Sequence, residues 1–203
     1  MSRLYLDANA TEPMRPEAVS AMAEALALPG NPSSVHAEGR AARRVLEEAR
    51  EVIATRFGAR GRDLVFTSGG TEANALAIRG LAAGRRVLVG ATEHPAVLAA
   101  AGAEAGVIPV LADGSLDLVA LEAALASGGP ALVAVMAANN ETGVLHPVES
   151  ISETCRRHGA LLHVDAVQMP GRLPFTLGAA DSMALSAHKM GGPKGVGALL
   201  LRP

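Results

Sequence analysis

The chain has 203 residues, 49% of them hydrophobic and 2% aromatic, with a formal net charge of −2 at pH 7. A chain of this length can bury a substantial core. It fits one large domain, or one smaller domain and about half of a second. A charge so close to neutral gives no electrostatic reason to expect nucleic acid or an anionic membrane as partner, and the rare aromatic side chains offer no stacking surface for single strands.

Three further absences narrow the class of protein. No segment approaches the roughly 20 uninterrupted apolar residues of a membrane span. The opening MSRLYLDANAT lacks the apolar core of a signal peptide. A single cysteine, Cys155, excludes an intramolecular disulfide framework and a cysteine-based metal cluster. We therefore expect a globular, cytoplasmic protein without a metal site.

Residues 1–60 predict an N-terminal arm and bracing helices ahead of the main domain. The residues between 40 and 50 mix arginines with Glu47 and Glu48, a pattern typical of a solvated helix face. The sequence predicts an extended segment, a helix, a loop and a second, long helix, in that order, over residues 3–8, 16–28, 30–34 and 36–57.

Residues 61–203 predict a single α/β domain, in which short apolar runs alternate with Ala-rich helical segments. The runs are continuous rather than alternating in polarity, which is typical of strands that helices cover on both faces. The predicted strands lie at residues 64–67, 86–90, 107–111, 131–136, 160–165, 183–186 and 196–201. The predicted helices lie at residues 72–81, 95–104, 118–126 and 148–158.

This alternation predicts a doubly wound sheet, mostly parallel and flanked by helices. Asp117 is a favourable N-cap for the third of these helices, and Gly159 is a favourable stop for the fourth. The last two strands follow each other with no room for a crossover helix, so we expect a mixed sheet there. The chain stops at Pro203 directly after an apolar strand, and we expect the sequence to be cut short of a complete domain.

In open α/β sheets the ligand crevice lies beyond the carboxyl ends of the strands, so the polar residues there are candidates for a site. Ser68-Gly69-Gly70-Thr71 follows the first strand and leads into a helix, whose N-terminus offers free N–H groups to an anion. An ordinary strand-to-helix turn explains the same residues equally well. The sequence has neither a Walker-type phosphate loop nor a GxGxxG dinucleotide motif.

Other strand ends carry residues that could take part in chemistry. His94 could stack on a ring or move protons, although a capping or surface histidine is the commoner outcome. Asp165 could pair with a protonated ring nitrogen or could simply cap a helix. Lys189 ends an apolar strand, where partial burial would lower the pKa of its amine, whereas most lysines face solvent. The NNETG cluster at 139–143 could equally be a turn.

An anion-binding turn, a histidine, an acid and a lysine at one sheet edge together form the set that pyridoxal 5′-phosphate (PLP) needs. The phosphate sits on the helix N-terminus, and the lysine holds the cofactor covalently. The acid keeps the pyridine nitrogen protonated, so that the ring acts as an electron sink. The combination therefore predicts a PLP enzyme more strongly than any of its members alone.

Seven motifs of the chain resemble those of the cysteine desulfurases, the NifS-like branch of the class V aminotransferases. In the family's order they are LDANAT, GNPSSVHAEGR, FTSGGTEANALAIRG, TEHPAVL, NNETG, HVDAVQ and SAHKMGGPKGVG. The resemblance covers essentially the whole chain. It implies a PLP-dependent transferase large domain of fold type I. It also implies a homodimer that takes sulfur from L-cysteine, leaves alanine and carries the sulfur as a persulfide for an acceptor protein.

The resemblance further implies roles for single residues. Lys189 would hold the cofactor and move the proton at the substrate's α-carbon, while His94 would stack on the pyridine ring and assist proton transfer. Asp165 would pair with the ring nitrogen. Asn140 and Gln168 would form hydrogen bonds near the phenolic oxygen of the ring. The groups that would hold the phosphate are Thr71, the backbone of Gly70, Ser186 and His188.

The chain departs from the family in what it contains after the lysine motif. Family members continue into a small domain with the nucleophilic cysteine and an arginine for the substrate carboxylate, and neither lies in this sequence. Cys155 matches no motif and is expected to be a packing residue, since buried cysteine behaves as a small hydrophobe. The DYNAT and ESNN motifs of the family read DANAT and EANA here, and both changes are tolerable.

Two other functions stay open at the level of the sequence. The chain could be a non-catalytic, truncated fragment that binds PLP weakly or serves as an interaction module, through apolar surface exposed where the small domain would dock. It could also be another class V enzyme, such as a selenocysteine lyase or an aminotransferase, because PLP-binding residues alone do not set the substrate. The sequence does not say whether the sulfur would serve iron–sulfur clusters, tRNA thiolation or another pathway.

The isolated chain is expected not to form a persulfide on itself, because the acceptor thiol of the family is missing. Incubation with PLP and L-cysteine, followed by assays for sulfide and alanine, checks this expectation. Production of either above the level given by free PLP would contradict it.

Overall fold

The fold is built on one seven-stranded mixed sheet, with the strand order β1-β7-β6-β5-β4-β2-β3. The computed structural model describes residues 4–202. Only β7 runs antiparallel to its neighbours; the other pairs are parallel. The strands are β1 (Leu64–Thr67), β2 (Arg86–Gly90), β3 (Gly106–Ile108), β4 (Ala131–Met136), β5 (Leu161–Asp165), β6 (Ser182–Ser186) and β7 (Gly197–Leu201).

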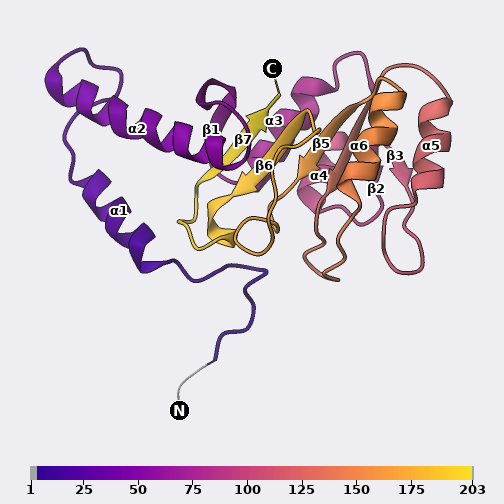
Figure 1. The fold of residues 1–203 in the computed structure, drawn as a ribbon, viewed down its shortest axis with the longest axis horizontal. Coiled ribbons are helices and arrows are strands. Elements are labelled where there is room, and N and C mark those ends of the chain that lie inside the picture. Colours follow the sequence, from indigo (N-terminus) through magenta and orange to yellow (C-terminus); the bar gives the residue numbers. More distant parts are fainter. Residues whose placement is uncertain (1–3, 203) are drawn as a thin grey trace.

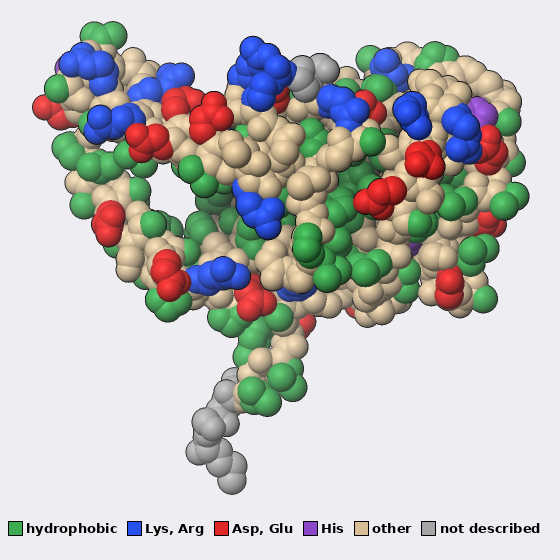
Figure 2. Space-filling model, in the orientation of Figure 1, with side chains coloured by type: hydrophobic (Ala, Val, Ile, Leu, Met, Phe, Trp, Pro, Cys, Tyr) green, Lys and Arg blue, Asp and Glu red, His purple; other side chains and the backbone are tan. Residues whose placement is uncertain are grey.

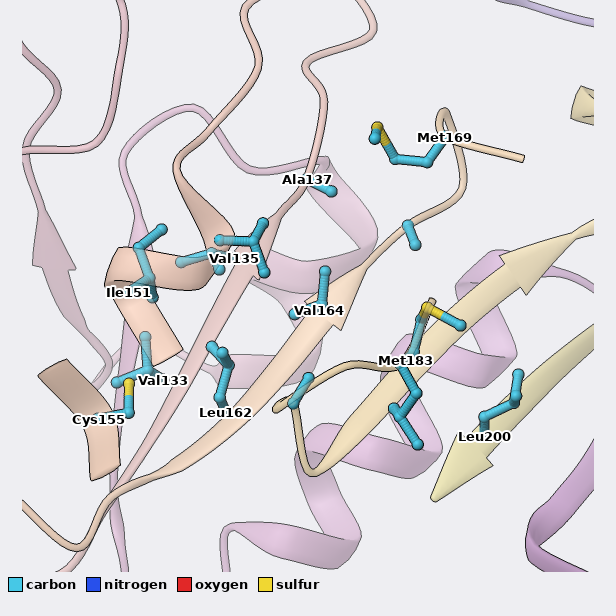
Figure 3. Close-up of a cluster of buried hydrophobic side chains, with 14 of the residues drawn as sticks. Val133, Val135, Ala137, Ile151, Cys155, Leu162, Val164, Met169, Met183 and Leu200 are labelled. Atoms are coloured by element: carbon cyan, nitrogen blue, oxygen red, sulfur yellow. The ribbon is translucent and has the colours of Figure 1, made fainter. Parts of the chain in front are cut away.

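Helices cover both faces of this sheet, as Figure 1 shows. α3 (Gly70–Leu81) and α4 (Pro95–Ala101) lie on one face, while α5 (Leu118–Ala126) and α6 (Val148–Arg157) lie on the other. The pleat of β4 divides the core accordingly. Leu132 packs in the cluster of α3 and α4, whereas Val133 packs in the larger cluster beneath α5 and α6 (Figure 3). The arrangement confirms the doubly wound, mixed sheet expected from the sequence.

The predicted strands and helices all form, and two of them end three residues earlier than expected. β3 stops at Ile108, before the predicted end at residue 111, because Pro109 has no N–H to donate to a ladder. α4 stops at Ala101 rather than at residue 104, because Gly102 takes a φ of +82° that ends the helix. The mixed edge arises as predicted, since β6 reaches β7 through a loop and the short helix η2 (Ala187–Lys189).

The N-terminal helices α1 (Pro16–Leu26) and α2 (Ala37–Arg56) reach away from the sheet beside β1 (Figure 1). α1 buries none of its residues within this chain. α2 is held by Arg50, which donates a 2.7 Å hydrogen bond to the carbonyl of Leu64 and lies 4.8 Å above the ring of Phe66. The outer face of α2 carries both positive and negative side chains, as predicted, and Figure 2 shows them interspersed. None of the helices within residues 4–202 combines the length and apolar character of a membrane span.

Replacement of Leu162, which is 1% exposed in the middle of β5, by alanine is expected to lower the free energy of unfolding by about 2–5 kcal/mol. The cavity left under α6 cannot close, because β5 is paired on both sides. The matched control is Val119→Ala on α5, a position 81% exposed, where the change should stay within about 0.5 kcal/mol. Urea unfolding curves of the three proteins check the difference, and equal midpoints would contradict this account of the core.

Candidate functional site

A cavity of about 210 Å³ opens at the carboxyl ends of β4, β5 and β6, beside the N-termini of α3 and α4. This edge is where the sequence predicts a ligand. All nine of the residues singled out as candidates line the cavity. They are Gly70, Thr71, His94, Asn140, Asp165, Gln168, Ser186, His188 and Lys189.

The N-terminus of α3 is pressed against the sheet at this edge. Gly197 of β7 approaches Gly69 so closely that a Cβ on Gly197 would lie 2.6 Å from the Cα of Gly69. A Cβ on Gly70 would lie 2.7 Å from a methyl group of Val167. Two small residues are therefore required for the first turn of the helix, with its N–H groups, to reach the end of the sheet.

Asp165 is the acid at the bottom of the cavity, at the last position of β5, and is 7% exposed. One carboxylate oxygen accepts a 3.0 Å hydrogen bond from the N–H of Val167, and the other accepts a 2.7 Å bond from the amide of Asn74. Burial raises the pKa of this carboxyl. The two hydrogen bonds and the positive charge of Lys189 oppose that rise.

Two buried polar residues behind Asp165 were not predicted from the sequence as part of the site. The amide oxygen of Asn74 lies 2.8 Å from Nε2 of His163, whose Nδ1 lies 2.8 Å from the hydroxyl of Ser182. His163 is fully buried, which lowers its pKa to about 3. The spacing contained a signal, because His163 and Asp165 share one face of a strand and Asn74 is one helical turn beyond Gly70.

Lys189 ends η2, directly after β6, and its amine donates a 2.5 Å hydrogen bond to the carbonyl of Asn9. Burial lowers the pKa of the amine, and the nearby guanidinium of Arg172 lowers it further. That guanidinium also holds the loop, since it donates a 2.8 Å hydrogen bond to the carbonyl of Lys189. The amine is thus partly desolvated, as the sequence led us to expect of a nucleophilic lysine.

The N-terminal segment 7–15 crosses the mouth of the cavity and is fastened to the lysine loop. Its backbone donates from Glu12 to His188 and from Arg15 to Gly191, each over 2.9 Å. The hydroxyl of Thr11 also lies 3.1 Å from Nδ1 of His188. The sequence offered only the LDANAT motif as a sign of this contact, because nothing in the local pattern says where an extended arm will lie.

Within this segment, Asn9 makes direct hydrogen bonds to residues that line the cavity. Its carbonyl accepts from the amide of Gln168 over 3.0 Å, in addition to the amine of Lys189. Its side chain donates a 3.0 Å hydrogen bond to the carbonyl of Asn140. The backbone and the side chain of Asn9 therefore connect three candidate residues, and it belongs to the site although it was not a candidate.

His94 is both a helix cap and a residue of the cavity, which are the two roles that the sequence left open. It is the N-cap of α4, where its Nδ1 accepts a 3.1 Å hydrogen bond from the N–H of Ala96, and it also lines the cavity. Its neighbour Glu93 is buried beneath the site, and one of its oxygens accepts a 2.9 Å bond from the N–H of Met136. Burial raises the pKa of Glu93 well above its usual value.

Cys155 is confirmed as a packing residue on the inner side of α6, where it is 1% exposed within the hydrophobic core (Figure 3) and does not line the cavity. Burial raises the pKa of its thiol to about 12, so it holds almost no thiolate near neutral pH. Among the described residues, no group of three or more His, Cys, Asp or Glu side chains is placed to hold a metal ion.

Comparison with known proteins gives one family. Residues 4–203 match the model of the family described as aminotransferase class V. An IscS-like cysteine desulfurase of Mycobacterium tuberculosis is 44% identical, with 98% of this chain and 55% of that protein covered. A cysteine desulfurase of Cereibacter sphaeroides is 48% identical, with 100% of this chain and 56% of that protein covered. The chain thus spans about half the length of the curated relatives that it matches.

Solved structures give the same picture of the fold. A NifS-like protein from Rickettsia africae superposes with a TM-score of 0.92 at 34% identity, over 98% of this chain and 58% of that one. A structure of SspA in complex with cysteine has a TM-score of 0.89 at 32% identity, over 98% of this chain and 61% of that one.

The buried His163 makes the stability of the fold depend on pH. Its pKa is about 3 when folded against an ordinary value of 6.5, so the unfolded chain binds the proton more tightly and stability falls as the pH drops below 6.5. Between pH 7 and pH 5 the loss should be about 2 kcal/mol. Urea unfolding at both pH values, with His163→Gln as the non-titrating control, isolates this contribution. The same pH dependence in both proteins would contradict it.

Proposed function

Since the chain belongs to the class V aminotransferase family, we propose that it forms the PLP-binding part of a cysteine desulfurase, which takes sulfur from L-cysteine and leaves alanine. The observation that carries the proposal is the convergence of Lys189, Asp165 and the N-terminus of α3 on one cavity. The names of the curated relatives support the choice of L-cysteine as substrate.

The residues around the cavity fit PLP. The N-terminus of α3 at Gly70 and Thr71 offers N–H groups to an anion, and Asp165 offers a buried acceptor in the same cavity. The side-chain oxygen of Gln168 is buried and has no hydrogen-bond partner within the described residues, as expected of a group whose partner is a bound ligand. When bound, PLP would supply the electron sink that stabilises negative charge at the substrate's α-carbon.

Lys189 has the properties that the amine role requires. Its lowered pKa increases the fraction of neutral amine near pH 7, which is the form that can act as a nucleophile or accept a proton. We assign to it the covalent attachment of the cofactor and the movement of the proton at the substrate's α-carbon. To act, the amine has to leave the carbonyl of Asn9, which it now contacts.

The remaining polar residues divide into two groups by their position. Asp165 would accept from the ring nitrogen, and His94, on the wall formed by the start of α4, would lie against the ring and pass protons. Asn140 and Gln168 would face the phenolic oxygen. The groups proposed to hold the phosphate, by donating to its oxygens, are Thr71, the backbone N–H of Gly70, Ser186 and His188.

The whole protein would work as a homodimer and pass sulfur to an acceptor protein in the cytoplasm. Leu4, Leu6 and Leu26 are 78–82% exposed on the N-terminal arm and α1, and apolar surface of this kind suits burial against a second subunit. We propose residues 1–60 as the bracing arm and residues 61–203 as the PLP-binding domain. The nucleophilic cysteine would be supplied from outside these residues, because the thiol of Cys155 is buried in the core.

The cofactor proposal is tested by the visible absorption of the chain after incubation with PLP and removal of the excess. A retained band is expected in the unchanged protein, and Lys189→Ala should reduce it to background because the covalent attachment is lost. The matched control is Lys194→Ala, an exposed lysine five residues further along the same loop, which should keep the band. The absence of a retained band from all three proteins, or its equal presence in Lys189→Ala, would overturn the proposal.

A further inference from the structure

A chain of four hydrogen-bonded side chains runs from the wall of the cavity into the interior of the sheet. It starts at Asp165 on β5, passes through Asn74 on α3 and His163 on β5, and ends at Ser182 on β6. Its three contacts measure 2.7, 2.8 and 2.8 Å. Asp165 and Asn74 both line the cavity, and Asp165 is the more exposed of the two, at 7% against 2%.

The inner members are sealed from solvent. Asn74 is 2% exposed, while His163 and Ser182 are 0% exposed. Water therefore cannot replace a contact in which two acceptors or two donors face each other, and each such mismatch would carry the full desolvation cost of a buried polar group. The direction of every hydrogen bond along the chain is consequently fixed by its neighbours.

The direction follows from the acid. An ionised carboxylate can only accept, so the amide nitrogen of Asn74 donates to Asp165, and the amide oxygen of Asn74 is turned toward His163. His163 must then carry its proton on Nε2, which leaves Nδ1 to accept from the hydroxyl of Ser182. The opposite direction would need a protonated Asp165, a rotated Asn74 amide and the other imidazole tautomer at the same time.

The charged surroundings of Asp165 favour the ionised form of this arrangement. Lys189 from η2 lies close enough for its positive charge to stabilise the ionised carboxylate. Glu93, in the turn that follows β2, is the acidic group that opposes it. Burial raises the pKa of Glu93, which disfavours a second negative charge beside Asp165.

We propose that Asn74, His163 and Ser182 are positioning residues that hold Asp165 as an ionised acceptor aimed into the cavity, where it pairs with the protonated ring nitrogen of the cofactor. The identity of that cofactor rests on the proposed function. The direction of the hydrogen bonds does not, because it follows from the ionised carboxylate of Asp165 and the buried contacts behind it. The buried hydrogen bonds behind Asp165 would thus make the site prefer a ligand with a cationic N–H group.

The first test uses the protein without PLP. Nitrogen-15 NMR of histidine-labelled protein should show His163 as the neutral imidazole with its proton on Nε2 and with no titration between pH 5 and pH 8. Ser182→Ala should leave the fold intact and shift the signal of Nδ1, which loses its donor. A proton on Nδ1, or a titration near the ordinary value of 6.5, would overturn the proposal.

The second test uses PLP labelled with nitrogen-15 in the ring. The unchanged protein should show the protonated ring nitrogen, and so should His163→Gln, whose amide can still donate to Asn74. His163→Leu removes that donor, so the ring signal should move toward the unprotonated position and PLP should bind about tenfold more weakly or worse. Near-ultraviolet circular dichroism and thermal unfolding show whether each variant is folded.

The outcomes separate this proposal from the proposed function. If the unchanged protein takes up no PLP, the proposed function fails, and the tautomer of His163 still decides the direction of the hydrogen bonds. If PLP binds but the ring signal and the affinity are the same in folded His163→Leu and His163→Gln, the positioning role is wrong. Should His163→Leu fail to fold, Ser182→Ala takes its place, and an unchanged ring signal there counts against the proposal.

Discussion

The close approach of α3 to the end of the sheet is the constraint on which the rest of the site depends. A side chain on Gly197 would collide with the backbone of Gly69, so only a glycine at position 197 lets the helix begin directly on the sheet. That position brings the free N–H groups of the first turn to the cavity. It also places Asn74, one turn further along, against Asp165. One backbone contact therefore sets both an anion-binding end and the support of the acid.

Burial at this edge of the sheet shifts the pKa values of the acidic and the basic side chains in opposite directions. It raises the pKa of Asp165 and of Glu93, and it lowers the pKa of Lys189 and of His163. Hydrogen bonds and the positive charge of Lys189 lower the pKa of Asp165 against the effect of burial. Glu93 has less such support, since its second oxygen has no hydrogen-bond partner among the described residues. The ionised form is therefore better supported at Asp165 than at Glu93, which favours a negative charge at the position facing the cavity.

The sequence predicted the sheet and the candidate residues well, because both depend on local patterns. Continuous apolar runs such as 131–136 identify strands covered on both faces, and the carboxyl end of each strand is then the natural place to look for a site. The contacts of Asn9 with Lys189 and of Asn74 with His163 could not be predicted in the same way. They join residues 180 and 89 positions apart, and only the tertiary packing of the arm and of α3 brings them together.

The contact between the carbonyl of Asn9 and the amine of Lys189 also says something about how the protein comes to be folded. It closes a loop of 180 residues, and contacts of such long range form late because the chain must lose much conformational freedom before they are made. On the ribosome, the arm is synthesised first and waits until β6 and η2 have emerged. The pocket is therefore among the last parts of the molecule to assemble, and a nascent chain that has not reached the lysine loop has no competent site with which to capture a ligand.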